Sequence, residues 1–244
     1  MRNLELARDH VTEHTRRRSM STPKPSRQPS RISLGRYPER GHYDFETIAA
    51  ILDDGLVCYV GTASENQPIV IPAIYGRIDR RLYVHGSSVA RWLKDSQSPS
   101  RVCVTVSLLD ALVLARSAYQ HTLNYRSVVV IAEAQAVVER DEKIEALRAI
   151  VEHVCPGRWN DVRHPTDAEL RATLVLRVPI AKASAKVRTG PPSDFESDLA
   201  RTTWAGTIPL HSLRGTPVDD PALAEGIGVP SYCREQRRCK TFIS

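Results

Sequence analysis

Two short stretches of the sequence place hydrogen-bonding side chains where a predicted strand ends or begins. In the first, "YVHGSSVAR" at residues 83–91, an apolar strand runs into His85, Ser87 and Ser88, and Arg91 follows about one helical turn later. Backbone N–H groups at a helix start, hydroxyls and a guanidinium are the donors that a phosphate monoester requires. The stretch is therefore a candidate phosphate site, although an ordinary helix cap with a solvated arginine has the same composition.

The second stretch, "HTLNYRSVVV" at residues 121–130, joins polar residues to a β-branched, apolar run. Its hydrogen-bonding side chains are those of His121, Asn124, Tyr125, Arg126 and Ser127. Donors fixed at the start of a packed strand need little reordering when a flat polar heterocycle binds. The stretch is a candidate ring-binding surface, and a polar hairpin loop is the alternative interpretation.

The composition is that of a globular protein with a substantial core. The chain has 244 residues, 41% of them hydrophobic and 25% charged. No apolar run approaches the roughly 20 residues that span a bilayer, and no secretory signal is recognisable, so we expect a cytoplasmic protein that does not bind membranes. The five cysteines form no C-x-x-C pair, and neither a disulfide framework nor a metal site is indicated.

The net charge of +6 is concentrated at the ends of the chain. Residues 1–40 hold ten Lys or Arg and four Asp or Glu, whereas residues 41–230 hold 20 basic and 23 acidic side chains. Because the middle of the chain is mildly acidic, we expect no nucleic-acid partner. We predict a disordered basic tail over residues 1–40, one domain over 41–218 and a loop-like tail over 219–244.

The hydrophobic periodicity between the tails is mostly that of strands. Helices are predicted at residues 43–54, 87–95 and 141–154, and strands at residues 56–63, 68–79, 80–86, 101–110, 111–118, 126–139 and 172–187. This order does not alternate strand and helix, which argues against a Rossmann sheet. We predict a mainly β fold with flanking helices, an antiparallel barrel of about six strands. Side chains fill a barrel of that size, so a ligand must bind outside it or at a subunit interface.

Several blocks of the sequence, in the same order from about Arg40 to Leu210, carry a resemblance to a known family. They are "ERGHYDFETIAAILDD", "YVHGSSVAR", "LVLARSAYQHTLNYRSVVV", "CPGRW" and "WAGTIPL". Together they resemble the flavin-nucleotide-binding branch of the pyridoxamine 5'-phosphate oxidase-like superfamily, which also includes the nitroimidazole-resistance reductases. The resemblance implies an FMN-binding split β-barrel that forms a homodimer, with flavin in two equivalent interface clefts.

The resemblance also implies roles for individual residues. Ser87 and Arg91, with the adjacent Ser88, would hold the FMN phosphate, and His85 would lie beside them. The stretch 124–127, that is Asn124, Tyr125, Arg126 and Ser127, would lie along the flavin, and Trp204 would pack near it. Two positions depart from the family pattern, since Ala90 replaces a serine before the arginine and Gln120 precedes His121 where two histidines are usual.

The implied function is that of an FMN-dependent oxidoreductase acting on a small molecule, with His121 as proton donor or substrate contact. A flavin-binding protein without turnover is one alternative. Another is a haem protein with His85 or His121 as axial ligand, and a deazaflavin is a third choice of cofactor.

The first prediction concerns Arg91. If its guanidinium neutralises the FMN phosphate, Arg91→Ala should weaken FMN binding by about 1.5–3 kcal/mol and leave riboflavin binding unchanged. Fluorescence titration of both flavins against both proteins measures this difference. Equal losses for the two flavins would indicate a damaged fold, and no loss for either would refute the phosphate assignment.

Overall fold

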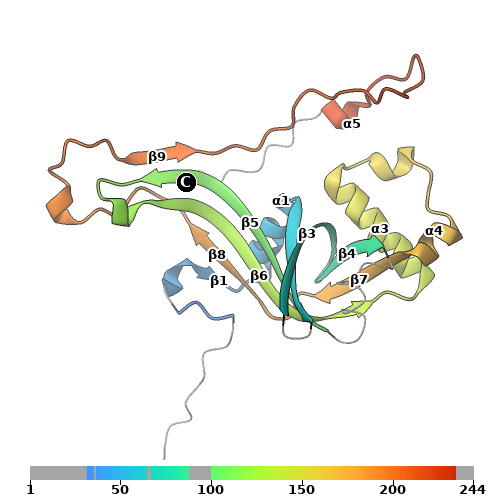
Figure 1. Ribbon diagram of the computed structural model, residues 1–244, viewed down its shortest axis with the longest axis horizontal. Helices are drawn as coiled ribbons and strands as arrows, with labels where there is room; N and C mark the ends of the chain where they lie inside the picture. The colour runs from blue at the N-terminus through green and yellow to red at the C-terminus, as the bar shows by residue number, and fades with distance from the viewer. Residues whose placement is uncertain (1–31, 36, 65–66, 88–99, 235–244) are drawn as a thin grey trace, which may run out of the picture.

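The computed structural model describes residues 32–35, 37–64, 67–87 and 100–234, which form one curved sheet with helices against its outside (Figure 1). The strands are β1 (Gly41–His42), β2 (Val57–Ser64), β3 (Gln67–Ile78), β4 (Arg81–Ser87), β5 (Ser100–Leu114), β6 (Thr122–Ala136), β7 (Thr173–Pro179), β8 (Ala183–Arg188) and β9 (Gly206–Pro209). The α-helices are α1 (Phe45–Asp54), α3 (Arg140–Val154), α4 (Asp167–Ala172) and α5 (Ser231–Arg234). Short 3-10 turns are η1 (Pro38–Arg40), η2 (Ala118–Gln120), η3 (Arg158–Asp161) and η4 (Glu196–Asp198).

The sheet closes on itself through β6, and every strand pairing is antiparallel. One end of β6 pairs with β7, while the rest of the strand pairs with β5 and β8. The strands β6, β7, β4, β3, β2 and β5 therefore form a ring of six, with β1, β8 and β9 added outside it. This is a split barrel, and it confirms the predicted fold class.

Two strand boundaries differ from those predicted. Residues 101–118 were expected to form two strands, but β5 continues past Asp110 with only a register shift between Leu109 and Ala111. Residues 172–187 were expected to form one strand, but the chain bends at residues 181–182, after the N–H of Ile180 has made a last hydrogen bond to the carbonyl of Arg80, and this bend separates β7 from β8. The predicted helix 87–95 lies outside the described residues apart from its first position.

Alternate side chains of the ring strands point inward and form the main core. Among the most buried are Val60, Leu82, Val84, Val104, Val106, Val128, Val130 and Leu176. Helix α1 closes one end of this core with Ile48, Ile51 and Leu52, and Tyr75 fixes its position by donating a hydrogen bond to the carbonyls of Leu52 and Gly55. The interior is filled, so it leaves no room for a ligand.

Helix α3 packs against β3 at a contact that requires glycine. A Cβ built on Gly76 would lie 2.5 Å from the carbonyl carbon of Ala149 and 2.6 Å from the nitrogen of Ile150. Since both atoms belong to the helix backbone, no side-chain rotation could relieve the overlap. Gly76 thus lets α3 approach the barrel closely.

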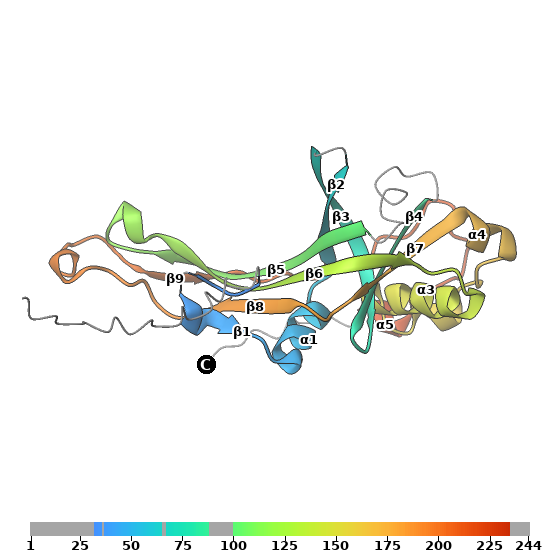
Figure 2. The same cartoon turned by 90° about the horizontal axis from the view of Figure 1, so that it is seen from below.

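One part of the sheet extends far beyond the barrel. In Figures 1 and 2, β5 and β6 run side by side from the barrel into a long arm that β8 and β9 flank. Both long strands have 15 residues, so the same strands serve the barrel and the arm. In the described part of the chain, no helix is both long and apolar enough to cross a membrane.

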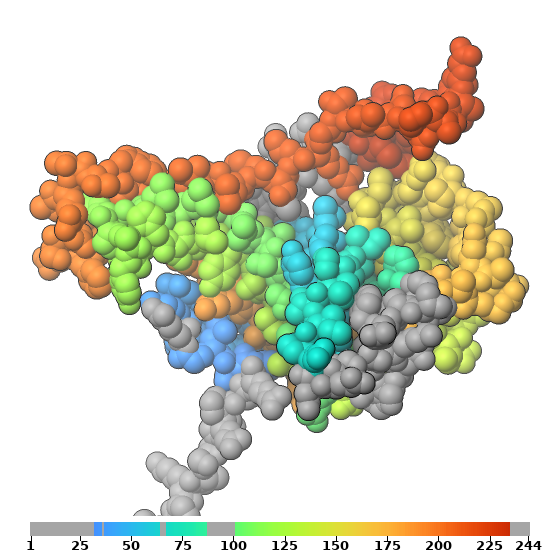
Figure 3. All heavy atoms as spheres, viewed as in Figure 1, coloured from blue at the N-terminus to red at the C-terminus, as the bar shows by residue number. Residues whose placement is uncertain are grey.

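The last described segment returns from the arm to the helices. It passes along one edge of the molecule after β9, as the orange and red atoms of Figure 3 show. Near its end, Tyr232 donates a hydrogen bond to Asp161 and accepts one from Arg158. The Sγ atoms of Cys155 and Cys233 lie 4.0 Å apart there. Of the predicted N-terminal tail, residues 38–40 form η1, and the other predicted boundaries stay predictions.

Candidate functional site

A pocket of about 620 Å³ lies in the arm, where η1 and the start of β6 meet β8. We call it the cationic pocket, and it is lined by Tyr37, Arg40, Tyr119, Gln120, His121, Thr122, Tyr125, Lys186, Arg188, Ser193 and Phe195. These residues come from three regions far apart in sequence, 37–40, 119–125 and 186–195, which the pairings β1–β8 and β6–β8 bring together. The volume is within the usual range for small-molecule sites.

The charge of this pocket is one-sided, because Arg40, Lys186 and Arg188 line it and none of the described lining residues is a carboxylate. Arg188 is only 6% exposed. Its guanidinium donates to the side-chain oxygen of Asn124 and, at 3.1 Å, to the carbonyl of Pro191, both of them uncharged acceptors. Burial and, after it, repulsion from Arg40 lower the pKa of Arg188. The pocket therefore suits an anionic group.

His121 projects from the strand start into the same pocket. Its Nδ1 lies 2.9 Å from the carbonyl oxygen of Ser117. A carbonyl only accepts, so Nδ1 carries the hydrogen, and in the neutral ring Nε2 has a free lone pair. His121 can therefore accept a proton, or donate one when protonated, at Nε2.

The predicted stretch 124–127 is divided between the two faces of β6. Tyr125 lines the cationic pocket, whereas Asn124 and Arg126 point to the opposite, buried face. Arg126 is 2% exposed, and its guanidinium lies 2.7 Å from Asp54 and 2.9 Å from Asp110. Burial alone would lower the pKa of Arg126, but the hydrogen bonds to Asp110 and Asp54 outweigh burial and raise it.

The outward face of β6 also carries Ser127, whose hydroxyl donates to the carbonyl of Lys186 at 3.4 Å. Trp204 lies just before β9 and is 62% exposed, with its indole against Gly206. Neither residue lines the cationic pocket.

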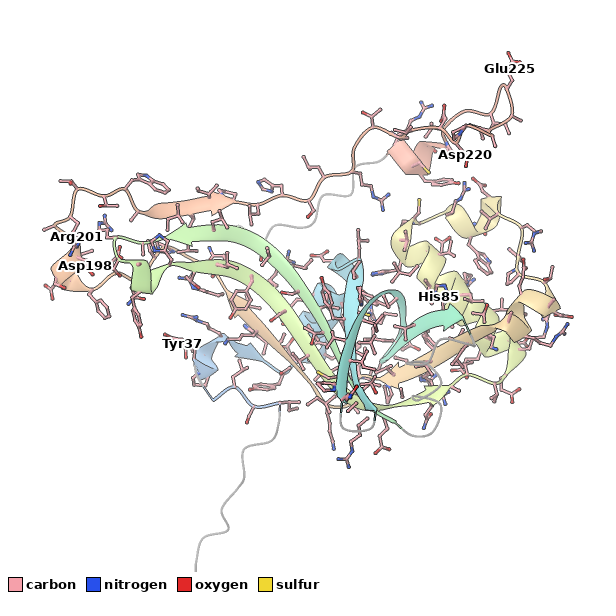
Figure 4. The ribbon with its side chains drawn as sticks, in the orientation of Figure 1. Tyr37, His85, Asp198, Arg201, Asp220 and Glu225 are labelled. Atoms are coloured by element: carbon pink, nitrogen blue, oxygen red, sulfur yellow. The ribbon has the colours of Figure 1, made fainter. Side chains whose placement is uncertain are left out.

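The predicted phosphate stretch lies away from this pocket, in the barrel. Figure 4 shows His85 on β4, far along the molecule from Tyr37, which marks the cationic pocket. The Nδ1 atom of His85 is buried and has no hydrogen-bond partner within the described residues. Burial lowers the pKa of His85, so the ring is neutral at pH 7. Ser87 ends β4 opposite Thr173, and Ser88 and Arg91 lie outside the described residues.

The structure thus brings His121 and Tyr125 together and keeps both apart from His85. The residues that sequence analysis missed are Tyr37, Arg40, Tyr119, Lys186, Arg188 and Phe195. All six lie outside the two polar stretches 83–91 and 121–130, and none belongs to a spaced motif. Only the strand pairing that places β8 beside β6 reveals them.

The middle of the chain matches a known protein family. The family model described as pyridoxamine 5'-phosphate oxidase matches residues 44–187, more than half of the chain. The chain belongs to the pyridoxamine 5'-phosphate oxidase family. This confirms the resemblance seen in the sequence. No protein with a curated description matches the chain.

Solved structures of this family include two that resemble nearly the whole described chain. The flavocytochrome Anf3 from Azotobacter vinelandii is 40% identical with a TM-score of 0.80, over 84% of this chain and 95% of that one. The FAD and heme binding protein from Mycobacterium smegmatis is 30% identical with a TM-score of 0.76, over 80% of this chain and 96% of that one. Both relatives therefore share the split-barrel fold of this chain.

The second prediction tests the role of Arg126. Removing its charge leaves Asp54 and Asp110 partly buried without a cation, so Arg126→Met should lower the free energy of unfolding by about 3 kcal/mol. Urea unfolding of the protein without cofactor measures the loss. Arg163→Met, which breaks the exposed ion pair with Glu169, is the matched control and should change little. An unchanged stability with weakened flavin binding would instead assign Arg126 to the cofactor.

Proposed function

We propose that the protein is an FMN-dependent oxidoreductase that acts on a small molecule. The observation that carries the proposal is the buried Nδ1 of His85 near the end of β4, which has no hydrogen-bond partner among the residues that the structure describes. Buried polar atoms are nearly always satisfied, so an orphaned one beside the predicted phosphate stretch indicates a bound group. Its neutral ring offers a hydrogen bond without repelling a cation such as Arg91.

The other site residues have distinct roles in this proposal. FMN, when bound, supplies hydride or electron transfer. The chain orients the substrate through Tyr125 and the other aromatic rings of the cationic pocket, and Nε2 of His121 holds or delivers a proton at the substrate. The carbonyl of Ser117 accepts a hydrogen bond from Nδ1 and so keeps the neutral ring in the tautomer that leaves Nε2 unprotonated.

The third prediction is that the purified protein carries FMN and catalyses reduction of a small-molecule acceptor when a reductant is supplied. We expect flavin absorption bands, release of a compound with the mass of FMN, and reoxidation of the reduced protein by a nitroaromatic acceptor. His121→Gln should keep the bound flavin and lower the rate of that reoxidation, about 100-fold if proton transfer limits it. FAD or a deazaflavin in the released fraction would refute the cofactor, and bound FMN without turnover would favour a binding protein.

We also propose that the protein is a homodimer, because the two halves of the site lie apart in one chain and would meet across an interface. An apolar face on β2 and β3 is left uncovered by the described residues and suits this contact. It comprises Val57, Tyr59, Val70 and Ile74, which are all exposed. In the register of β2 and β3, Val57 pairs with Ile74 and Gly61 with Val70, so the face is continuous.

The fourth prediction follows from this face. Light scattering should give twice the chain mass of 27.2 kDa. Val70→Asp should shift the protein toward monomer, since a desolvated carboxylate would be unpaired in an apolar interface. Val138→Asp, at a position 81% exposed and remote from this face, is the control. A monomer in the unmodified protein contradicts the proposal, as does a dimer insensitive to Val70→Asp.

Haem is a second candidate cofactor, favoured by the flavocytochrome relative that covers 84% of the chain. His121 would hold the haem iron through Nε2, because its Nδ1 donates to a carbonyl and leaves Nε2 free. The absorption spectrum separates the candidates, since haem gives a Soret band near 400 nm and FMN bands near 370 and 450 nm.

A further inference from the structure

We infer that the cationic pocket binds a small aromatic carboxylate, which Arg40, Lys186 and Arg188 hold by its acid group. That this ligand is the substrate rests on the proposed function, whereas its binding does not. The proposal combines three independent features of the pocket, namely uncompensated charge, exposed aromatic rings and a backbone held in an uncommon conformation.

The charge is the first feature. Arg188 is buried at the base of the pocket with only neutral oxygen acceptors around it, although buried arginines are nearly always paired with a carboxylate or phosphate. Lys186 lies two residues earlier on β8, so both side chains leave the same face of the strand. No carboxylate among the lining residues offsets them. An acid group supplied by a ligand would complete the arrangement.

The aromatic rings are the second feature. Tyr119 and Phe195 are 76% and 53% exposed, yet their rings stack with centroids 6.3 Å apart and planes 17° from parallel. Tyr125 lines the same pocket. Large exposed rings gathered around a concavity are typical of a site for a planar ligand. Such a ligand would carry its acid group toward the three cations.

The third feature is the backbone at Tyr37. This residue has φ 59° and ψ 59°, in the left-handed region that costs a side-chain-bearing residue free energy. The conformation places its ring under the guanidinium of Arg40, whose central carbon lies 4.0 Å from the ring centroid. Arg40 is thereby oriented at the pocket that Arg188 also lines, with the exposed Glu39 3.9 Å away, and burial followed by the charge of Arg40 lowers the pKa of Arg188. Two mutually repelling cations held in this way favour an anion between them.

A phosphate of the flavin is the other source of such an anion. The predicted phosphate stretch begins at the end of β4, which Figure 4 shows on the far side of the molecule from Tyr37. Within one chain, the flavin phosphate and the cationic pocket are therefore separate. In the proposed homodimer the pocket of one chain would meet the phosphate stretch of the partner, so experiment separates the two sources: weaker binding of FMN but not of riboflavin in the pocket variants reveals a flavin phosphate.

The experiment compares two isosteric nitroaromatics on FMN-loaded protein. The probe is 4-nitrobenzoate, and its neutral counterpart is 4-nitrobenzamide, both titrated by calorimetry. We expect the carboxylate to bind at least tenfold more tightly. Lys186→Gln and Arg40→Gln should each weaken 4-nitrobenzoate binding about tenfold and leave 4-nitrobenzamide binding unchanged. Arg171→Gln, at an exposed position on α4, is the matched control and should affect neither ligand.

Each result supports or overturns the inference. Equal affinity for the two nitroaromatics overturns the inference. It is also overturned if the Lys186 and Arg40 variants keep their fold but bind both nitroaromatics more weakly. If these variants instead weaken FMN binding and spare riboflavin, the pocket holds the cofactor phosphate, which also overturns it. Tight, charge-dependent binding without any turnover upholds the carboxylate site and refutes only the proposed oxidoreductase function.

Discussion

The ion cluster of Arg126, Asp54 and Asp110 joins three parts of the molecule at the point where the barrel continues into the arm. Asp54 ends α1, Asp110 lies at the register shift of β5, and Arg126 comes from β6. The backbone of Asp110 also accepts a hydrogen bond from Leu210, just after β9. Because a charge of either sign is costly to bury alone, the three side chains must be placed together. The register of the arm against the barrel depends on this cluster.

This placement sets the two faces of β6. With Arg126 directed inward, Tyr125 must point outward, because successive side chains of a strand alternate. Tyr125 therefore reaches the cationic pocket. The side-chain amide of Asn124 donates a hydrogen bond to the carbonyl of Gly190, which brings the loop after β8 toward the same end. A structural charge cluster inside the sheet thus positions a candidate binding surface outside it.

The sequence was sufficient to predict the fold class and family, because hydrophobic alternation and ordered local blocks are properties of neighbouring residues. Helix 141–154 and strand 80–86 were accordingly predicted within a residue or so of α3 and β4. The cationic pocket could not be predicted. Arg40 and Arg188 are separated by 148 positions in the sequence, and only the pairing of β1 with β8 brings their segments together. The role of Arg126 was likewise hidden, since Asp54 lies 72 positions away in sequence and Asp110 is reached only through the pairing of β5 with β6.

The length of β6 has a consequence for how this protein can change. The strand runs without interruption from Thr122 in the arm to Ala136 in the barrel, a span of roughly 50 Å at the usual rise per residue. Its length therefore sets the distance between the arm and the barrel. An insertion or deletion of one residue would exchange the faces of Tyr125 and Arg126, exposing the charge and burying the ring. A substitution can change the arm or the barrel separately, whereas a change in the length of β6 alters the register of both.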